Sequence, residues 1–426
     1  MERSWIERDA AVVWHGFTQM GCYGDNAPVI VERAEGHELI DTAGKRYLDA
    51  ISSLWVTTLG HRVPELDQAL RAQLDRVAHT TLLGNGNRMV IEFAEALAKV
   101  VPVDQPHMVF AADGSCAVEQ ALKIAFQYWT NQGITERTTY LTFSNAYHGD
   151  TVGSLSLGAG GFGTRIFDPL RFPVLRAPAF VEPGALETAA RMVREHRDIL
   201  AAVVVEPLVQ GAAGMLTAPA ETFAQLAQAC HETGVLLICD EVATGFGRTG
   251  TLFASEQCGL RPDLLCLGKG ITGGYLPMSA TVANDKVFRE FLGPDLSERT
   301  LYHGHSYGGN ALAAAVALRH LQLMESRSVL QNVRARSAQL RDGLSQLQRF
   351  TCVHEIRLVG LMGAVELDTT DDPLLARRVC AAMVRRGVLS RSMGPVVTIV
   401  PLLTSTREEI DRIVDTLGAA LEEVSI

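Results

Sequence analysis

Three stretches in the middle of the chain are apolar without interruption and have the length of a β-strand. They cover residues 201–205, 235–239 and 264–267. Continuous rather than alternating apolarity indicates strands buried on both faces, as in a parallel sheet covered by helices. Residues 220–232, between the first two stretches, fit a helix, and residues 115–129 keep apolar side chains at helical spacing. This alternation predicts a large α/β domain with a mostly parallel sheet.

The pattern changes over the last hundred residues. There the sequence predicts helices over 312–324 and 329–347, a short strand over 358–365, a helix over 373–386, a strand over 396–400 and a final helix from residue 406. The first sixty residues contain short strands and turns. We therefore expect a large domain of residues 66–321 and a smaller α+β domain built from residues 1–65 and 322–426. A chain of 426 residues is long enough for two such cores.

Composition and charge argue against several classes of protein. The formal net charge is −10, and the basic stretches are diluted by acids, so nucleic acid or an anionic membrane surface is not an expected partner. No apolar run has the length of a membrane span, and no secretory signal is recognised. The eight cysteines are dispersed without a C-x-x-C pair, which predicts reduced thiols in a cytoplasmic protein. His303 and His305 lack a third ligand nearby, so no metal site is predicted.

Charged residues follow two of the three apolar runs. Asp240 comes directly after the second run, and Lys269 follows the third between Gly268 and Gly270. Ligands of open α/β sheets bind beyond the carboxyl ends of the strands, so the two side chains should meet in one crevice. They could form a structural ion pair, but the glycines leave room for a ligand to approach the backbone. Pyridoxal phosphate needs this combination, a lysine that forms a Schiff base and a carboxylate that keeps the pyridine nitrogen protonated.

A phosphate group needs hydrogen-bond donors. Gly114 and Ser115 stand at the start of the helix predicted over 115–129, where free N–H groups and the helix dipole attract an anion. An ordinary helix cap would explain the same residues. Tyr147 is a candidate to stack on the cofactor ring, and an ordinary core aromatic is the alternative.

Gly158, Gly160 and Gly163 spell the G-x-G-x-x-G fingerprint of dinucleotide-binding proteins. Residues 165–173 contain two prolines and open no helix, and no acidic residue ends a second strand about twenty positions later. The pattern therefore predicts a loop rather than a dinucleotide site.

Two longer stretches carry Asp240, Lys269 and the turn between them. They read CDEVATGFGRTG at 239–250 and PDLLCLGKGITGG at 262–274. These stretches resemble the cofactor signature of class III (ω-type) aminotransferases, which have fold type I of the pyridoxal-phosphate-dependent transferases. The resemblance extends over nearly the whole chain. It implies a seven-stranded, mostly parallel sheet in the large domain and pyridoxal 5'-phosphate as the cofactor.

The resemblance also implies a role for each matching residue. Lys269 would carry the cofactor, and Asp240 would face its ring nitrogen. Gly114 and Ser115 would hold the phosphate, and Tyr147 would lie on the ring. Ser306 of a second subunit would give the phosphate a further hydroxyl, which makes the protein a homodimer with shared active sites.

Further stretches resemble those class III aminotransferases that act in biotin biosynthesis. They are WHGFTQM at 14–20, SSLW at 52–55, YHGDT at 147–151 and HGHSYGGN at 303–310. The resemblance implies small-molecule substrates and a ping-pong reaction, in which an amino donor first aminates the cofactor and the cofactor then aminates 7-keto-8-aminopelargonate. Arg391 would bind the carboxylate of this keto acid. The residues implied to line the substrate channel are Phe17, Leu54, Trp55, Arg248 and Gly304.

The amino donor stays open between lysine and S-adenosylmethionine. The forms that use S-adenosylmethionine carry a Trp-Trp pair and a Tyr where this chain has Leu54-Trp55 and Phe17, and the loss of an indole and a phenol favours lysine. Thr398 stands where glutamate-using members carry an arginine, so weak activity with glutamate is expected. The alternatives are another ω-aminotransferase that acts on diamines or β-amino acids, and a mutase or decarboxylase of fold type I.

Overall fold

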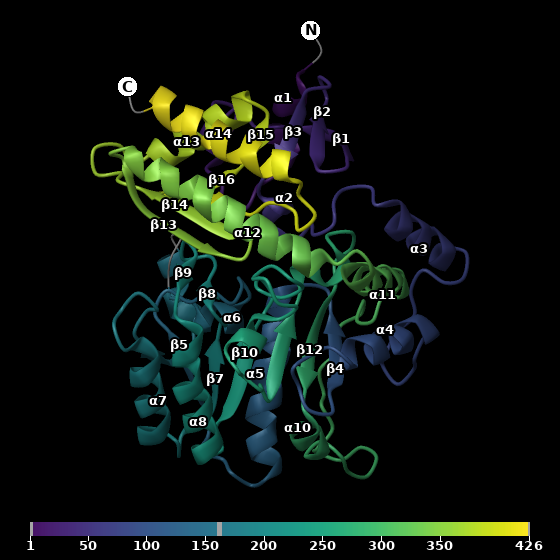
Figure 1. Cartoon of the computed structure of the whole chain (residues 1–426). Helices are drawn as coiled ribbons and strands as arrows, with labels where there is room; N and C mark the ends of the chain where they lie inside the picture. The colour runs from purple at the N-terminus through teal and green to yellow at the C-terminus, as the bar shows by residue number, and fades with distance from the viewer. Residues whose placement is uncertain (1–2, 160–163, 425–426) are drawn as a thin grey trace.

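A computed structural model describes residues 3–159 and 164–424. A seven-stranded sheet lies in the lower half of Figure 1. In spatial order its strands are β4 (His107–Ala111), β12 (Ser279–Ala283), β11 (Leu264–Leu267), β10 (Leu236–Asp240), β7 (Leu200–Val205), β5 (Thr139–Phe143) and β6 (Leu175–Ala177). In this sheet β12 runs opposite to the other six strands, and all pairs without β12 are parallel. The three predicted strands are β7, β10 and β11, in the middle of the sheet, and the prediction of a mostly parallel sheet is confirmed.

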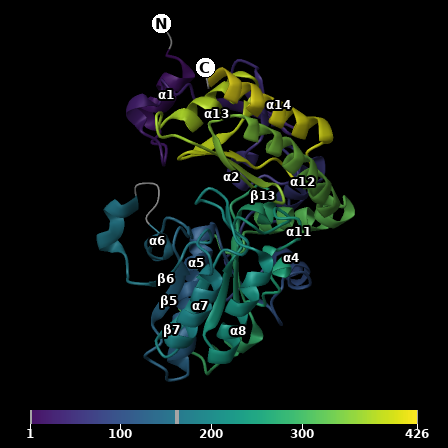
Figure 2. The same cartoon turned by 60° about the vertical axis from the view of Figure 1, so that its left-hand side comes forward.

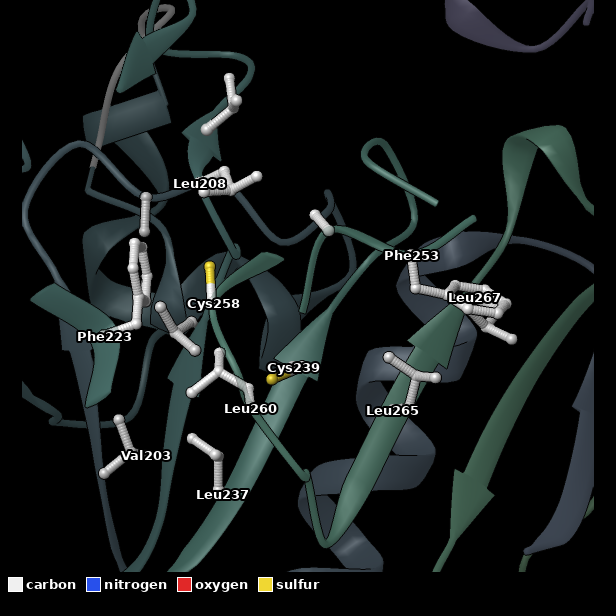
Figure 3. Packing of buried hydrophobic residues seen from close by; sticks show 14 of the residues in the cluster. Val203, Leu208, Phe223, Leu237, Cys239, Phe253, Cys258, Leu260, Leu265 and Leu267 are labelled. Atoms are coloured by element: carbon white, nitrogen blue, oxygen red, sulfur yellow. The ribbon is translucent and has the colours of Figure 1, made fainter. Parts of the chain in front are cut away.

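The central strands send alternate side chains into two cores, because successive residues of a strand point to opposite faces. Val203 and Leu237 pack on the face with α7 (Ala185–Glu195) and α8 (Phe223–Thr233), and Figure 3 shows them in one cluster of side chains with Phe223 of α8. Their neighbours Val204 and Ile238 pack on the other face with α5 (Gly114–Asn131). Burial of each such side chain contributes roughly 1.5–3 kcal/mol. This two-sided burial fixes the strand ends that carry the site.

Further elements complete this half of the molecule. They are α3 (Pro64–Leu74), α4 (Arg88–Ala98), α6 (Val152–Leu157), α9 (Ala254–Gln257), α10 (Asp285–Arg289), α11 (Ala311–Ser326), the 3-10 helices η2 (Thr164–Leu170), η3 (Ala220–Thr222) and η4 (Lys269–Thr272), and the β8 (Val209–Gln210) and β9 (Leu216–Thr217) pair. Of the G-x-G-x-x-G glycines, Gly160 and Gly163 lie outside the described residues, and Gly158 ends α6.

Both ends of the chain build a second layer in the upper half of Figure 1, and Figure 2 shows the same layer turned. One sheet has the order β1 (Val31–Glu35), β2 (Glu38–Asp41), β3 (Arg46–Asp49) and β15 (Val388–Leu389), and the other β13 (Val353–Val359), β14 (Met362–Leu367), β17 (Val396–Ile399) and β16 (Arg391–Met393). The remaining elements are α1 (Trp5–Val12), η1 (Met20–Cys22), α2 (Ser52–Trp55), α12 (Val329–Ser345), η5 (Gln346–Arg349), α13 (Leu375–Arg385) and α14 (Arg407–Val424). Because β3 and β15 pair in parallel, the N-terminal and C-terminal segments form one unit.

One element of this layer differs from the sequence prediction. The single strand predicted over 358–365 is a hairpin of β13 and β14 that turns at Gly360. Gly360 has φ 58°, and a β-carbon at this position would lie 2.4 Å from the carbonyl oxygen of Arg248. The apolar run continues through the turn, so its pattern did not reveal the reversal.

The division into domains remains our proposal, and α11 packs in the cores of both layers. Its Ala313 and Ala317 lie in the core around the seven-stranded sheet, whereas Val316 lies in the core of the second layer. Leu66 of α3, one residue beyond the predicted segment 1–65, is also buried in the core of the second layer. Within residues 3–159 and 164–424, no helix combines the length and apolarity that crossing a membrane requires. The same described residues hold no group of three or more His, Cys, Asp or Glu placed to bind a metal ion.

Candidate active site

A pocket opens at the carboxyl ends of β10 and β11. Asp240 is the last residue of β10 and pairs in register with Cys266 of β11, and Lys269 opens η4 directly after β11. The pocket is lined by Trp55, Asp113, Gly114, Ser115, Tyr147, His148, Gly149, Glu206, Ala212, Asp240, Val242, Ala243, Thr244 and Lys269. The structure thus brings together the predicted acid, lysine, phosphate-binding residues and aromatic ring.

Lys269 presents its amine to the pocket. Burial lowers the pKa of the Lys269 amine, and the negative charges of Asp240 and Glu206 offset only part of this effect. A neutral amine is the form that attacks a carbonyl carbon. The Lys269 Nζ lies 5.3 Å from the centre of the Trp55 ring. Among the described residues the ion-pair partner of Asp240 is His148 rather than Lys269, so the structural Asp–Lys pair considered above is not formed.

His148 holds the Asp240 carboxylate in place. The His148 Nδ1 donates to Asp240 Oδ2 at 2.7 Å, and the Val242 N–H donates to Asp240 Oδ1 at 3.0 Å. Burial alone would lower the pKa of His148, but the hydrogen bond and charge of Asp240 outweigh it and raise the pKa. A protonated imidazole in this position stabilises the ionised carboxylate that a pyridine nitrogen requires. The sequence analysis missed His148, although it directly follows Tyr147.

The N-terminus of α5 contributes Gly114 and Ser115 to the pocket. Asp113, not Ser115, caps this helix, since its Oδ1 accepts from the Cys116 N–H at 3.0 Å. The ordinary-cap explanation therefore does not account for Ser115, whose Oγ accepts from the Asp150 N–H at 3.2 Å. At Gly114 a β-carbon would lie 2.5 Å from Val242 Cγ1. Any larger residue would require Val242 to move, and N–H groups at a helix N-terminus attract an anion.

Tyr147 and Glu206 also line the pocket and are hydrogen-bonded to each other. Tyr147 is half-buried, its hydroxyl donates to Asp150 Oδ2 at 2.9 Å, and its N–H donates to Glu206 Oε2 at 3.1 Å. The Gly211 N–H donates to Glu206 Oε1 at 3.1 Å. Burial raises the pKa of Glu206 to about 7, and the charge of Asp240 adds to the rise. Sequence reasoning missed Glu206 too, because a lone carboxylate after a strand carries no distinctive spacing.

These residues fit pyridoxal 5'-phosphate on the chemistry of the donor set. An amine of lowered pKa, a carboxylate held by a buried imidazole of raised pKa, a helix N-terminus and a tyrosine face one pocket. In this order, they would bind or face the aldehyde, the ring nitrogen, the phosphate and the ring face of that cofactor.

Of the remaining predicted residues, Trp55 alone is among those that line the pocket. Trp55 lines the pocket and is 6% exposed, whereas Phe17 and Leu54 are 60% and 45% exposed. Arg391, in β16, is also exposed. Gly304 and Ser306 are exposed in the loop before α11 and do not line the pocket of their own chain.

Arg248 is placed differently from the sequence expectation. It is 2% exposed, and its guanidinium donates to the carbonyl oxygens of Thr57, at 3.2 Å, and Pro401. Burial lowers its pKa to about 10. Its donors join two main-chain segments, and it is not among the residues that line the pocket.

The fold and this pocket define a pyridoxal-phosphate-dependent enzyme of fold type I. The family model described as aminotransferase class-III matches residues 21–421, and the chain belongs to this family. It is therefore an aminotransferase that depends on pyridoxal phosphate and acts on small molecules.

Individual relatives are similar over nearly the whole chain. The adenosylmethionine-8-amino-7-oxononanoate aminotransferase of Nitratidesulfovibrio vulgaris is 46% identical, over 98% of this chain and 81% of the relative. The crystal structure of the aminotransferase of the same name from Methanocaldococcus jannaschii superposes with a TM-score of 0.95 at 36% identity, over 99% of both chains. An amine transaminase from an uncultivated Pseudomonas species, solved in its pyridoxal-phosphate-bound form, has a TM-score of 0.91 at 32% identity, over 97% of this chain and 98% of that one.

Proposed function

We propose that the protein aminates 8-amino-7-oxononanoate, also called 7-keto-8-aminopelargonate, to 7,8-diaminononanoate in biotin biosynthesis. The observation that carries the proposal is the pocket of Asp240, Lys269 and Trp55 in a chain 46% identical, over 98% of its length, to an aminotransferase named for that keto acid. The reaction follows a ping-pong course, in which donor and keto acid use one site in turn.

Each pocket residue has a distinct task in this proposal. Pyridoxal phosphate, when bound, supplies the electron sink of the reaction. Lys269 holds the cofactor and, once released, moves the proton at the reacting carbon. Asp240, braced by His148, holds a proton on the ring nitrogen. Gly114 and Ser115 bind the phosphate at the N-terminus of α5, and Tyr147 covers the ring.

We assign the substrate-binding roles to Trp55 and to three exposed residues. Trp55 forms a wall beside Lys269, and Arg391, whose guanidinium is exposed, binds the carboxylate of the keto acid. Phe17 and Leu54 expose apolar surface that suits the aliphatic chain of that acid. Arg248 has a structural task, because its guanidinium donates to the carbonyl oxygens of Thr57 and Pro401 and does not touch the substrate.

The indications on the amino donor differ. The names of the relatives specify adenosylmethionine. Leu54 and Phe17, however, replace the indole and the phenol of the forms that use this donor, which favours lysine. Thr398 is buried and donates its hydroxyl hydrogen to the Arg391 carbonyl at 2.7 Å, so this position offers no guanidinium to a second carboxylate. We therefore expect glutamate to be a weak donor.

A homodimer completes the site in this proposal. Ser306 and Gly304 are exposed, and large apolar side chains around them are exposed as well: Leu83 by 64%, Tyr302 by 67% and Tyr307 by 62%. A second copy that covers this surface would bring its Ser306 to the phosphate. Light scattering should give twice the chain mass of 46.1 kDa. A monomer that binds the cofactor tightly would contradict the shared site.

All eight cysteines are free thiols, which supports a reducing compartment, and we propose the cytoplasm.

The function is tested with the purified holoenzyme and 8-amino-7-oxononanoate, supplied with lysine, S-adenosylmethionine or glutamate in separate reactions. We expect 7,8-diaminononanoate, detected by mass spectrometry, with one of the first two donors, and none from the Lys269→Ala variant. Release of the keto product of the donor excludes a mutase or decarboxylase. If other ω-amines are converted while this keto acid is not aminated by any donor, the substrate assignment is wrong and the class assignment stands.

A further inference from the structure

The turn Ser52–Trp55 has an unusual backbone. All four residues have positive φ, at 50°, 50°, 80° and 67°, and none is glycine. In this left-handed conformation the β-carbon of an L-residue crowds the following carbonyl oxygen. Such a conformation persists only where surrounding contacts impose it. The contacts that hold this turn should therefore be identifiable.

The turn carries Trp55 into the active site. The indole lines the pocket, stands 5.3 Å from Lys269 Nζ, and packs against Gly211, where a β-carbon would lie 3.1 Å from Trp55 Cζ3. The Trp55 Nε1 is buried and has no hydrogen-bond partner among the described residues. Because the indole makes no hydrogen bond of its own there, packing and the backbone of the turn set its position.

Asp49 provides the contacts that hold the backbone. Its side chain is fully buried, and Oδ1 accepts from the N–H groups of Ile51, at 3.2 Å, and Ser53, at 3.1 Å. Oδ2 accepts from Ser53 Oγ at 3.0 Å and from His61 Nε2 at 3.0 Å. The carboxylate thus engages the residues on either side of Ser52, while His61 anchors it from outside the turn.

We propose that Asp49, supported by His61, is a positioning residue that holds the left-handed turn and thereby sets Trp55 beside Lys269 for the amino-transfer reaction. Asp49 does not line the pocket, so it acts on the substrate only through Trp55. The proposal rests on the aminotransferase activity and on Trp55 as part of the binding wall. It requires neither donor in particular.

The chain contains a matched control in Asp41. Its Oδ1 accepts from the N–H groups of Ala43 and Lys45, both at 2.9 Å, and its Oδ2 accepts from the Tyr47 hydroxyl at 2.8 Å. Both carboxylates therefore bind N–H groups two and four residues ahead and a side-chain donor. Asp41 lies at the end of β2, where the chain turns into β3, and it does not line the pocket. Asp41→Asn should disturb its own turn and leave the reaction unchanged.

The first arm measures the turn itself. Hydrogen exchange of the holoenzyme, followed by mass spectrometry, should show faster exchange of the peptide covering 51–55 in Asp49→Asn and no change there in Asp41→Asn. Unchanged exchange of this peptide in Asp49→Asn would overturn the proposal. This arm needs no substrate, so it stands even if neither lysine nor S-adenosylmethionine reacts with the wild-type enzyme, a result that would defeat the proposed function alone.

The second arm tests whether Asp49 acts through Trp55. At the lower bound of its usual contribution, the loss of a hydrogen bond to a charged group weakens binding about tenfold. Asp49→Asn should therefore raise KM for the reacting donor about tenfold, with kcat within about twofold of wild type. In a Trp55→Ala background the same substitution should change KM by less than about twofold, because the group it positions is gone. Ser53→Ala, which removes one of the four contacts, should give a smaller rise. An equal effect of Asp49→Asn with and without Trp55 would overturn the proposal, since a general loss of structure acts in both backgrounds.

Discussion

Replacing His148 by phenylalanine tests the role of the buried Asp240 pair. The substitution keeps a flat ring of similar volume but removes the Nδ1 donor that lies 2.7 Å from Asp240 Oδ2. A hydrogen bond to a charged group contributes roughly 1.5–3 kcal/mol. If the pair stabilises the ionised Asp240 during proton transfer, this range corresponds to a fall of about 10- to 150-fold in kcat. The remaining contact of Asp240, from the Val242 N–H, limits the loss.

The assay is a single-turnover donor reaction that follows loss of the absorbance band of the lysine-bound cofactor. His148→Asn is the matched variant, because its amide can still donate to Asp240 without a charge, and it should fall between wild type and His148→Phe. The pKa of His148 is raised in the folded state, so its contribution to stability is full at low pH and is lost as pH rises through that raised value. Rates of His148→Phe within twofold of wild type would refute the assigned role.

Three further predictions follow from individual contacts. Burial raises the pKa of Glu206 from 4.5 to about 7, so the cofactor-free protein should lose roughly 3 kcal/mol of stability as pH rises across that window, and Glu206→Gln should flatten the dependence in urea titrations at pH 4.5 and 8. Arg248→Met leaves two buried carbonyl oxygens without donors and should lower the free energy of unfolding by roughly 2–6 kcal/mol, and an unchanged urea midpoint would count against this. Gly114→Ala should raise the Kd for pyridoxal phosphate about tenfold, because its β-carbon would lie 2.5 Å from Val242 Cγ1, and Val242→Ala should restore binding in the double variant.

The central sheet was predictable because its signal is local. Strands β7, β10 and β11 are buried on both faces, so their residues are apolar without alternation, and the polar residues that follow them mark the strand ends. Asp240 and Lys269 could be paired on this ground before any resemblance was considered. The hairpin at Gly360 was not predictable, since the apolar pattern of β13 and β14 continues across the turn.

Other parts of the site depend on contacts between distant segments, which spacing does not record. His148 contacts Asp240 across 92 positions of the chain, and the Glu206 carboxylate accepts a hydrogen bond from the Tyr147 N–H across 59 positions. Arg248 was expected to face substrate, but the carbonyl that it binds at Pro401 is 153 positions away. The left-handed backbone at residues 52–55 leaves no mark in the sequence, because none of these residues is glycine.

The central claim is that Lys269 carries the cofactor while Asp240 faces the same ring. The most direct measurement is reduction of the holoenzyme with borohydride, which makes the lysine–cofactor linkage permanent, followed by mass mapping of its peptides. We expect the cofactor mass on the peptide that contains Lys269, and its loss in Lys269→Ala. Attachment at another lysine, or no attachment in protein that binds the cofactor, would contradict the account.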